Sequence, residues 1–185
     1  MCISVHQLCY VHADKEPLFQ NINLIVNTGQ RLALVGNNGT GKLTLLRIIE
    51  GNLKPSSGEV VCSSRPYYIP QHFGQFDNLT VAEALRVDDR IKALHAILEG
   101  DASAENFTCL NDDWDVEERC LSALASWNLE HLQLSQPMCS LSGGEKTKVF
   151  HSGILVHAPE IILMDEPTNH LDVSGREQLY EMIRS

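Results

Sequence analysis

The 185-residue sequence has no apolar run that approaches the roughly 18–20 residues of a membrane-spanning helix. It also lacks a basic N-terminal start followed by an apolar block, so we expect no signal peptide. Its six cysteines are scattered and none forms a CxxC pair, which argues against both a disulfide scaffold and a zinc site. A reducing, cytoplasmic location fits this use of cysteine best.

Basic residues are also scarce, because 14 Lys and Arg stand against 24 Asp and Glu, which gives a formal net charge of -10. This balance argues against a general nucleic-acid binder, although a local basic patch is compatible with it. With 43% hydrophobic and 21% charged residues, the composition is that of an ordinary globular domain with a sizeable core.

A glycine-rich stretch, GNNGTGKLT, occupies residues 36–44. The apolar run 32–35 predicts a buried strand before it, and the spacing over 42–51 predicts a helix after it that ends at Gly51. G-x-x-x-x-G-K in this context is typical of a phosphate-binding loop, and a simple glycine-rich turn is the weaker alternative. The glycines let backbone N–H groups converge on phosphates, and Lys42 neutralises them.

The residue after this lysine lacks the hydroxyl that a magnesium site needs there. It is Leu43, which offers no oxygen ligand, and Thr44 points about 100° further round the helix. We therefore expect phosphate binding to survive in weakened form and magnesium-dependent hydrolysis to be poor.

Two further motifs carry candidate chemistry. The apolar strand predicted within 160–167 ends in Asp165 and Glu166, which suit a magnesium ligand and a base that polarises water. In LSGGEK, Ser142 and Glu145 have the spacing of a helix capping box. Two glycines in a first helical turn cost about 1 kcal/mol each against alanine, which suggests close approach to a phosphate.

Other periodicities predict the remaining elements. The alternation over 22–26, followed by a turn at 27–29, predicts a hairpin with 32–35. Helices are expected over 79–100, which opens with a Thr80–Glu83 capping box, and over 115–132. Residues 100–113 are expected to form a loop. The residues expected to face inward from the second helix are Val116, Leu121, Leu124 and Trp127. His151, which follows the LSGGEK stretch, is read as a structural rather than a catalytic residue.

Taken together in this order, GxxGxGK, Gln71, LSGGE, the DE pair and NHLD resemble the ATP-binding cassette family. The resemblance implies an α/β fold: a P-loop NTPase (RecA-like) core with an antiparallel β subdomain and an inserted α-helical subdomain. We expect the core at 1–71 and 159–185 and the helical subdomain at about 72–158. It also implies ATP and Mg²⁺ as cofactors, and a second cassette that closes head to tail to sandwich the ATP.

The resemblance assigns a role to each matching residue. The phosphate loop would comprise Gly36, Asn37, Asn38, Gly39, Thr40, Gly41, Lys42, Leu43 and Thr44, with Thr44 near the α-phosphate. The opposite nucleotide would meet Ser142, Gly143 and Gly144, and Asp172 would close the D-loop.

At the reaction centre, the resemblance makes Glu166 the catalytic base, Asp165 a magnesium residue, and Gln71 a contact to both magnesium and the attacking water. Tyr10 would stack on adenine, with Phe19 as a competitor for that role.

The signature with Glu145 and the DEPTNHLD run resemble the ABC-F group. Many members of that group act on the ribosome, in translation or in resistance to ribosome-targeting antibiotics. The alternatives are the ATP-binding subunit of a membrane transporter, which more often carries LSGGQ, and a non-catalytic nucleotide-dependent binding module, which Leu43 favours. The family places a switch histidine beyond Ser185, so we expect a C-terminally incomplete cassette whose hydrolysis is slowed by this truncation as well as by Leu43. We expect its longer form to have a second cassette and to contact the ribosome.

Overall fold

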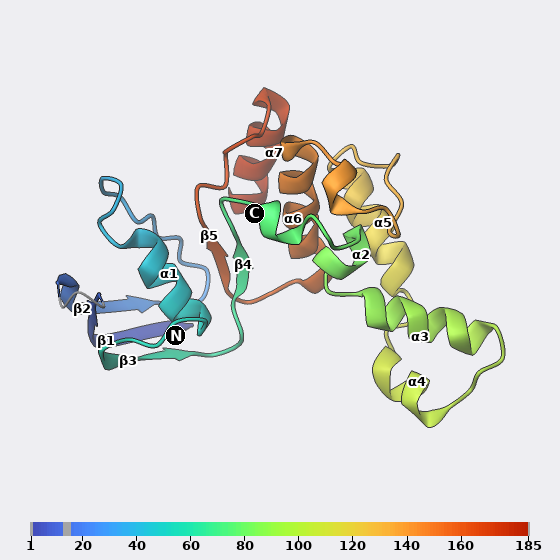
Figure 1. Cartoon of the computed structure of the whole chain (residues 1–185), viewed down its shortest axis with the longest axis horizontal. Coiled ribbons are helices and arrows are strands. Elements are labelled where there is room, and N and C mark those ends of the chain that lie inside the picture. Colours follow the sequence, from blue (N-terminus) through green and yellow to red (C-terminus); the bar gives the residue numbers. More distant parts are fainter. Residues whose placement is uncertain (1, 13–15, 185) are drawn as a thin grey trace. The chain divides into compact units, whose positions relative to one another are not determined.

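The computed structural model describes residues 2–12 and 16–184 and forms two compact units. The first comprises residues 1–69 and 159–165, and the second comprises residues 70–158 and 166–185. The second unit contains the residues expected to form the helical subdomain, about 72–158, and also residues 166–185, which the resemblance places in the core. Figure 1 shows the order of the elements along the chain.

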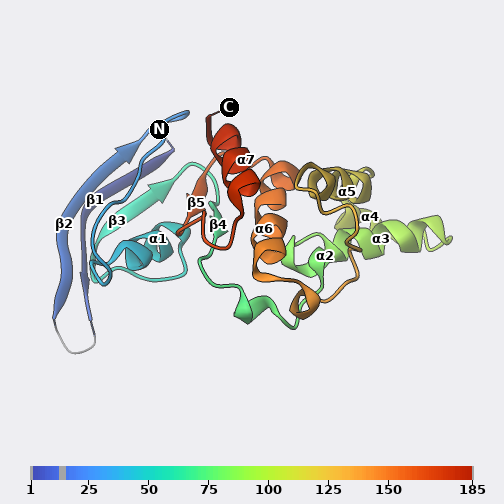
Figure 2. The same cartoon turned by 90° about the horizontal axis from the view of Figure 1, so that it is seen from above.

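In the first unit, an antiparallel sheet has the strand order β2-β1-β3. Its strands are β1 (Ile3–Val11), β2 (Pro17–Val26) and β3 (Ser57–Cys62). Val5 pairs with Leu24 on one side and with Val60 on the other. Helix α1 (Lys42–Glu50) covers one face of this sheet (Figure 2), and its apolar residues join a core with the fully buried Val5 and Leu8.

A second, parallel pair joins β4 (Tyr67–Ile69) to β5 (Ile162–Met164). Parallel strands need a long crossover between them, and here the helical residues provide it. The backbone N–H of Asp165 continues the ladder by donating to the carbonyl of Ile69 at 3.0 Å. The apolar run of β5 therefore delivers the carboxylate of Asp165 to the end of a strand, as the sequence predicted.

The predicted buried strand over 32–35 is wrong. The structure has no regular secondary structure there, and Leu32 and Val35 are 53% and 93% exposed. A strand needs a hydrogen-bonded neighbour, and β2 pairs with β1 instead. No other strand among the described residues lies beside 32–35, although the predicted turn forms, with Gln30 N–H donating to Asn27 O at 3.0 Å.

The second unit is helical (Figure 1). Its helices are α2 (Val81–Ala84), α3 (Asp88–Leu98), α4 (Ala104–Leu110), α5 (Val116–Ser126), α6 (Gly143–His157) and α7 (Val173–Arg184), with short 3₁₀ turns at Gly74–Phe76 and Met138–Ser140. No helix of the described residues is both long and apolar enough to cross a membrane.

Four predictions for the helical unit need correction. The helix expected over 115–132 already ends at Ser126, and Asn128 adopts φ +58° just beyond that end. The single helix over 79–100 is broken, because Arg86 adopts φ +59° and ends α2 before α3 begins. The expected loop over 100–113 contains α4, which Ser103 caps by accepting from Asn106 N–H and which buries Leu110. Leu121 is 46% exposed rather than inward, because Cys120 and Ala123 occupy the buried face of α5.

Other predictions for this unit are confirmed. Thr80 and Ser142 both form complete capping boxes. Trp127 and His151 are fully buried, with ring centroids 5.1 Å apart. The ring Nδ1 of His151 lies 2.8 Å from the carbonyl oxygen of Thr147, so it donates to the preceding turn of α6.

Candidate functional site

The glycine loop of the first unit is exposed and is held by its own backbone. The ammonium of Lys42 donates to the carbonyls of Gly36 at 2.7 Å and Asn37 at 2.9 Å, and the hydroxyl of Thr40 donates to Asn37 O at 2.9 Å. Asn38 and Gly39 complete the exposed turn, with Gly39 at φ +83°. The lysine thus lies across the loop, where a phosphate would replace the carbonyl oxygens as its partner.

Helix α1 begins without any side-chain cap. Its N-cap is Gly41 at φ +92°, and its first turn contains no acidic residue. The first N–H groups of a helix have no partner within the helix, and the helix dipole makes this end attractive to anions. An anion therefore fits this end of α1, and Lys42 at its first position adds a full positive charge.

Gly41 also explains how the loop meets the sheet. A Cβ built on Gly41 would lie 2.9 Å from a ring carbon of Phe19 and 3.0 Å from the side chain of Leu18. Phe19 therefore lies against the phosphate loop, and Tyr10 pairs with it across β1 and β2 with ring centroids 6.1 Å apart. Both aromatic rings remain candidates for stacking on a base.

Leu43 and Thr44 follow the lysine on α1. Leu43 is 39% exposed and Thr44 is half-buried. Leucine presents an apolar group where a hydroxyl would serve a cation, so this position contributes no ligand.

Asp165 is buried in the first unit, with 9% of the residue exposed. Burial, with Asp165 as a second cause, raises the pKa of Tyr68 to about 12, so the phenol stays neutral. Tyr68 was not singled out from the sequence, and it lies on β4, where it pairs with Leu163 of β5. Asp165 suits Mg²⁺, but without a hydroxyl at position 43 the residues of this unit fit the ion only in part, and no cluster of three His, Cys, Asp or Glu occurs among the described residues.

The second unit holds the candidate base. Glu166 Oε2 accepts hydrogen bonds from Gln71 Nε2 at 2.6 Å and from Asn169 Nδ2 at 2.7 Å. The structure thus brings together Glu166 and Gln71, two of the residues that the sequence singled out. Asn169, read from sequence only as part of a family motif, is the third member of this cluster.

The signature turn begins α6 in the same unit. Ser142 Oγ accepts from Glu145 N–H at 3.3 Å, and Ser142 N–H donates to Glu145 Oε2 at 2.8 Å. These bonds, together with His131 at 2.9 Å from Glu145 Oε1, lower the pKa of Glu145 to about 2. Gly143 and Gly144 are the first two residues of this capped helix, and their N–H groups face its N-terminal end.

Segment 166–172 lies against this turn. The imidazole ring of His170 lies near Gly143, and its backbone carbonyl oxygen lies near Gly144. The carboxylate of Asp172 accepts a hydrogen bond from Gly175 N–H at 2.8 Å at the start of α7. Asp172 also lies 3.8 Å from the ammonium of Lys148 on α6. The second unit thus contains both Gln71 and Glu166, expected at the reaction centre, and residues 142–144, expected at the opposite nucleotide. The phosphate loop and Asp165 belong to the first unit.

Comparison with known proteins gives the family. A family model described as ABC transporter matches residues 19–169. The Probable ATP-binding protein YbiT of Escherichia coli O157:H7 is 34% identical over 170 residues, which cover 90% of this chain and 28% of that protein. ABC transporter F family member 2 of Arabidopsis thaliana is 32% identical over 181 residues, which cover 98% of this chain and 24% of that protein.

The transporter side of the family is equally similar. The Zinc import ATP-binding protein ZnuC of Vibrio parahaemolyticus is 32% identical over 185 residues, which cover 99% of this chain and 62% of that protein. A solved ATP-binding subunit of an ABC transporter is 26% identical, with a TM-score of 0.74 over 100% of this chain and 74% of its own. The chain thus spans between 24% and 62% of these curated relatives. The matches confirm the predicted α/β, P-loop NTPase fold, and the chain belongs to the ABC transporter family as an ATP-binding cassette.

Proposed function

We propose that this chain binds ATP at the N-terminus of α1 and, within a pair of cassettes, hydrolyses it. The observation that carries the proposal is the uncapped start of α1. Three glycines lie in the loop before this helix, Lys42 is its first residue, and its first turn contains no acidic residue. The negative charge of a triphosphate would bind to the free N–H groups of this helix start and to the ammonium of Lys42. The family match to ATP-binding cassettes supports ATP as the nucleotide.

Hydrolysis is assigned to the second unit. Both amides contact Oε2 of Glu166, so Oε1 is the oxygen that we propose takes the proton of the attacking water. Gln71 would orient that water while it holds the carboxylate. Mg²⁺, when bound, would neutralise phosphate charge, with Asp165 as its protein residue.

We further propose that Leu43 makes this hydrolysis slow. The position cannot ligate a cation, so ATP binding relies on Lys42 and the backbone of the loop. If turnover is absent altogether, the chain is a nucleotide-dependent binding module rather than an enzyme, and Leu43 is the observation that favours this second reading.

For the longer protein, we propose an ABC-F type factor that contacts the ribosome. Glu145 in LSGGE and the NHLD run support this reading, together with the similarity to Arabidopsis F family proteins. The ATP-binding subunit of a membrane transporter is the alternative, supported by the similarity to ZnuC and to energy-coupling factor proteins. Co-sedimentation of the full-length protein with ribosomes or with membranes separates the two.

The test is ATP binding and turnover, with and without magnesium, for this chain and for Leu43→Ser. A hydroxyl at position 43 restores one magnesium ligand, so we expect magnesium to tighten ATP binding in the variant by about tenfold, the scale of one charge-assisted contact. Leu43→Ala is the matched control, since it removes the leucine without adding an oxygen. Equal binding by all three proteins with and without magnesium would overturn the role given to Leu43.

A further inference from the structure

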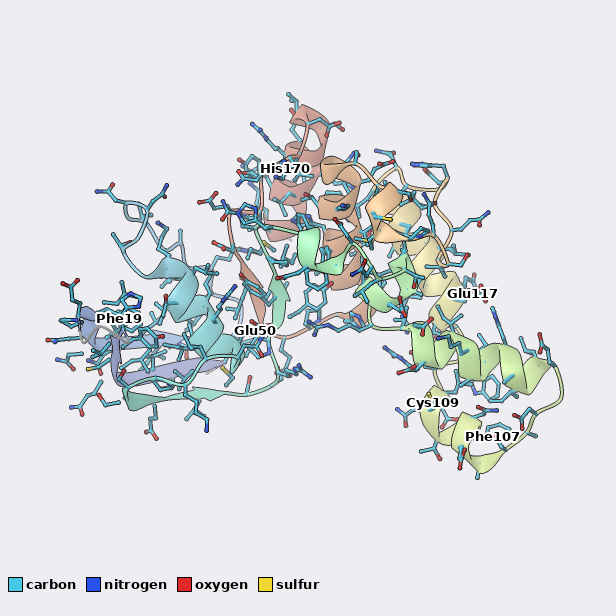
Figure 3. The ribbon with its side chains drawn as sticks, in the orientation of Figure 1. Phe19, Glu50, Phe107, Cys109, Glu117 and His170 are labelled. Atoms are coloured by element: carbon cyan, nitrogen blue, oxygen red, sulfur yellow. The ribbon has the colours of Figure 1, made fainter. Side chains whose placement is uncertain are left out.

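Segment 166–172 makes two close contacts with the first turn of α6. A Cβ built on Gly144 would lie 3.0 Å from the backbone carbonyl oxygen of His170, and one built on Gly143 would lie 3.6 Å from its imidazole ring. The hydroxyl of Thr147, one turn further along α6, lies 3.5 Å from the carbonyl oxygen of Asn169. Figure 3 labels His170 on this segment.

The same segment holds Glu166 at its other end. Asn169 Nδ2 donates to the carboxylate of Glu166 at 2.7 Å, and Asn169 N–H donates to the carbonyl of Glu166 at 3.0 Å. A four-residue turn thus closes on itself through both the backbone and the side chain. Any displacement of Asn169 would therefore move the carboxylate.

Backbone conformation indicates that this turn depends on external support. Glu166 and His170 adopt φ values of +47° and +64°, in the left-handed region that favours glycine. Residues other than glycine remain there when the surrounding structure holds them. The contacts with Gly143, Gly144 and Thr147 are that surrounding structure.

From these contacts we propose that Asn169 and His170 are positioning residues, which couple the carboxylate of Glu166 to the signature turn of the same chain. Gly144 is then required by the carbonyl of His170 and not only by a phosphate. The term base for Glu166 rests on the proposed function, whereas the physical coupling does not.

The two glycines provide a matched pair of variants for the test. In Gly144→Ala the new methyl meets a backbone oxygen at 3.0 Å, so segment 166–172 must shift, whereas in Gly143→Ala the contact is of ordinary van der Waals length. The measurement is the NMR spectrum of the full chain without nucleotide. We expect Gly144→Ala to move the side-chain amide signals of Asn169 and Gln71 and the backbone amide of Glu166, and Gly143→Ala to leave them in place.

Shifts confined to residues near position 144, or equal shifts in both variants, would overturn the proposal. If Gly144→Ala does not fold, His170→Gly serves instead, because glycine keeps the left-handed backbone and removes the ring. In that variant we expect the amides of Gly143 and Glu166 both to shift. A change limited to residues 169–171 would contradict the coupling.

No nucleotide is present in these spectra, so their result does not depend on ATP binding. A chain that fails to bind ATP yet shows the Gly144→Ala shifts would sink the proposed function and leave the coupling intact. A chain that binds ATP but shows no such shifts would contradict the coupling and leave the proposed function intact.

Discussion

Two helix N-termini in this chain are built in opposite ways. Helix α1 starts at a glycine, with no side-chain cap and no acidic residue in its first turn. Helix α6 starts at Ser142, which forms a capping box with Glu145, and that carboxylate is further held by His131. The first end is open to an anion, whereas the second already has side-chain acceptors on two of its N–H groups, those of Ser142 and Glu145.

The phosphate loop is formed by one continuous stretch of sequence, whereas the signature turn is not. The phosphate loop needs only glycines, a lysine and a helix start, all contiguous in sequence. The signature turn depends on residues from elsewhere in its unit, namely His131, Asn169 and His170. Substitutions in the loop should therefore affect ligand binding, and substitutions around α6 should affect stability.

The largest expected effect is on the stability of the unit that contains α6. Burial lowers the pKa of His151 to about 4 in the folded chain, against 6.5 for the free side chain. The unfolded chain therefore binds more protons between these values, and the free energy of unfolding falls by about 3 kcal/mol as the pH is lowered from 6.5 to 4. Denaturant unfolding at several pH values measures this loss.

His151→Leu is the control for that slope. It removes the titrating group and the ring Nε2, which has no hydrogen-bond partner. Burial also lowers the pKa of His157, so a smaller slope of the same sign should persist in the variant. If the free energy of unfolding depends on pH as strongly in His151→Leu as in the original chain, protonation of His151 is not the cause of the loss.

The next largest effect belongs to the open end. Lys42→Ala removes the cation from the start of α1, and we expect ATP affinity to fall about 10–100-fold, as for a charge-assisted hydrogen bond. The melting temperature should change by no more than about 2 °C, because the side chain serves an exposed loop. Lys54→Ala, which removes the same charge elsewhere in the unit, should leave affinity unchanged. A large loss of stability in Lys42→Ala would break the contrast between the two helix starts.

The smallest effect compares two capping boxes. Ser142→Ala and Thr80→Ala each remove the side-chain acceptor of a helix start, at a cost of about 1 kcal/mol. Thermal melting should report similar losses for both variants. Only Ser142→Ala should also weaken ATP-driven association of two chains, and an equal effect of Thr80→Ala would assign that loss to folding alone.

Contiguous signals predicted the elements that hold the candidate site, but not the central strand β1. The glycine loop, α1 with its end at Gly51, both capping boxes and the strand that leads to Asp165 all depend on neighbours in sequence, and all are confirmed. The predicted strand over 32–35 is wrong because a strand depends on a partner that local alternation does not identify.

The errors in the helical unit have the same origin. Periodicity over 79–100 continues through Arg86, whose positive φ gave no sequence signal. The site shows a parallel limit. Gln71 and Glu166 were expected individually, but the hydrogen bond that joins them directly links residues 95 positions apart, and Asn169 adds a second bond to the same carboxylate. The cost of Gly143 and Gly144 was recognised, whereas the nearby carbonyl of His170 was not.

The most direct measurement is a titration of the isotope-labelled chain with ATP and magnesium, followed by backbone amide signals at two protein concentrations. We expect the amide signals of residues 36–44 to shift at both concentrations, because the open start of α1 binds nucleotide without a second chain. Residues 142–144 should shift only at the concentration where chains associate. Shifts at 142–144 in the isolated chain without shifts at 36–44 would contradict nucleotide binding at the start of α1.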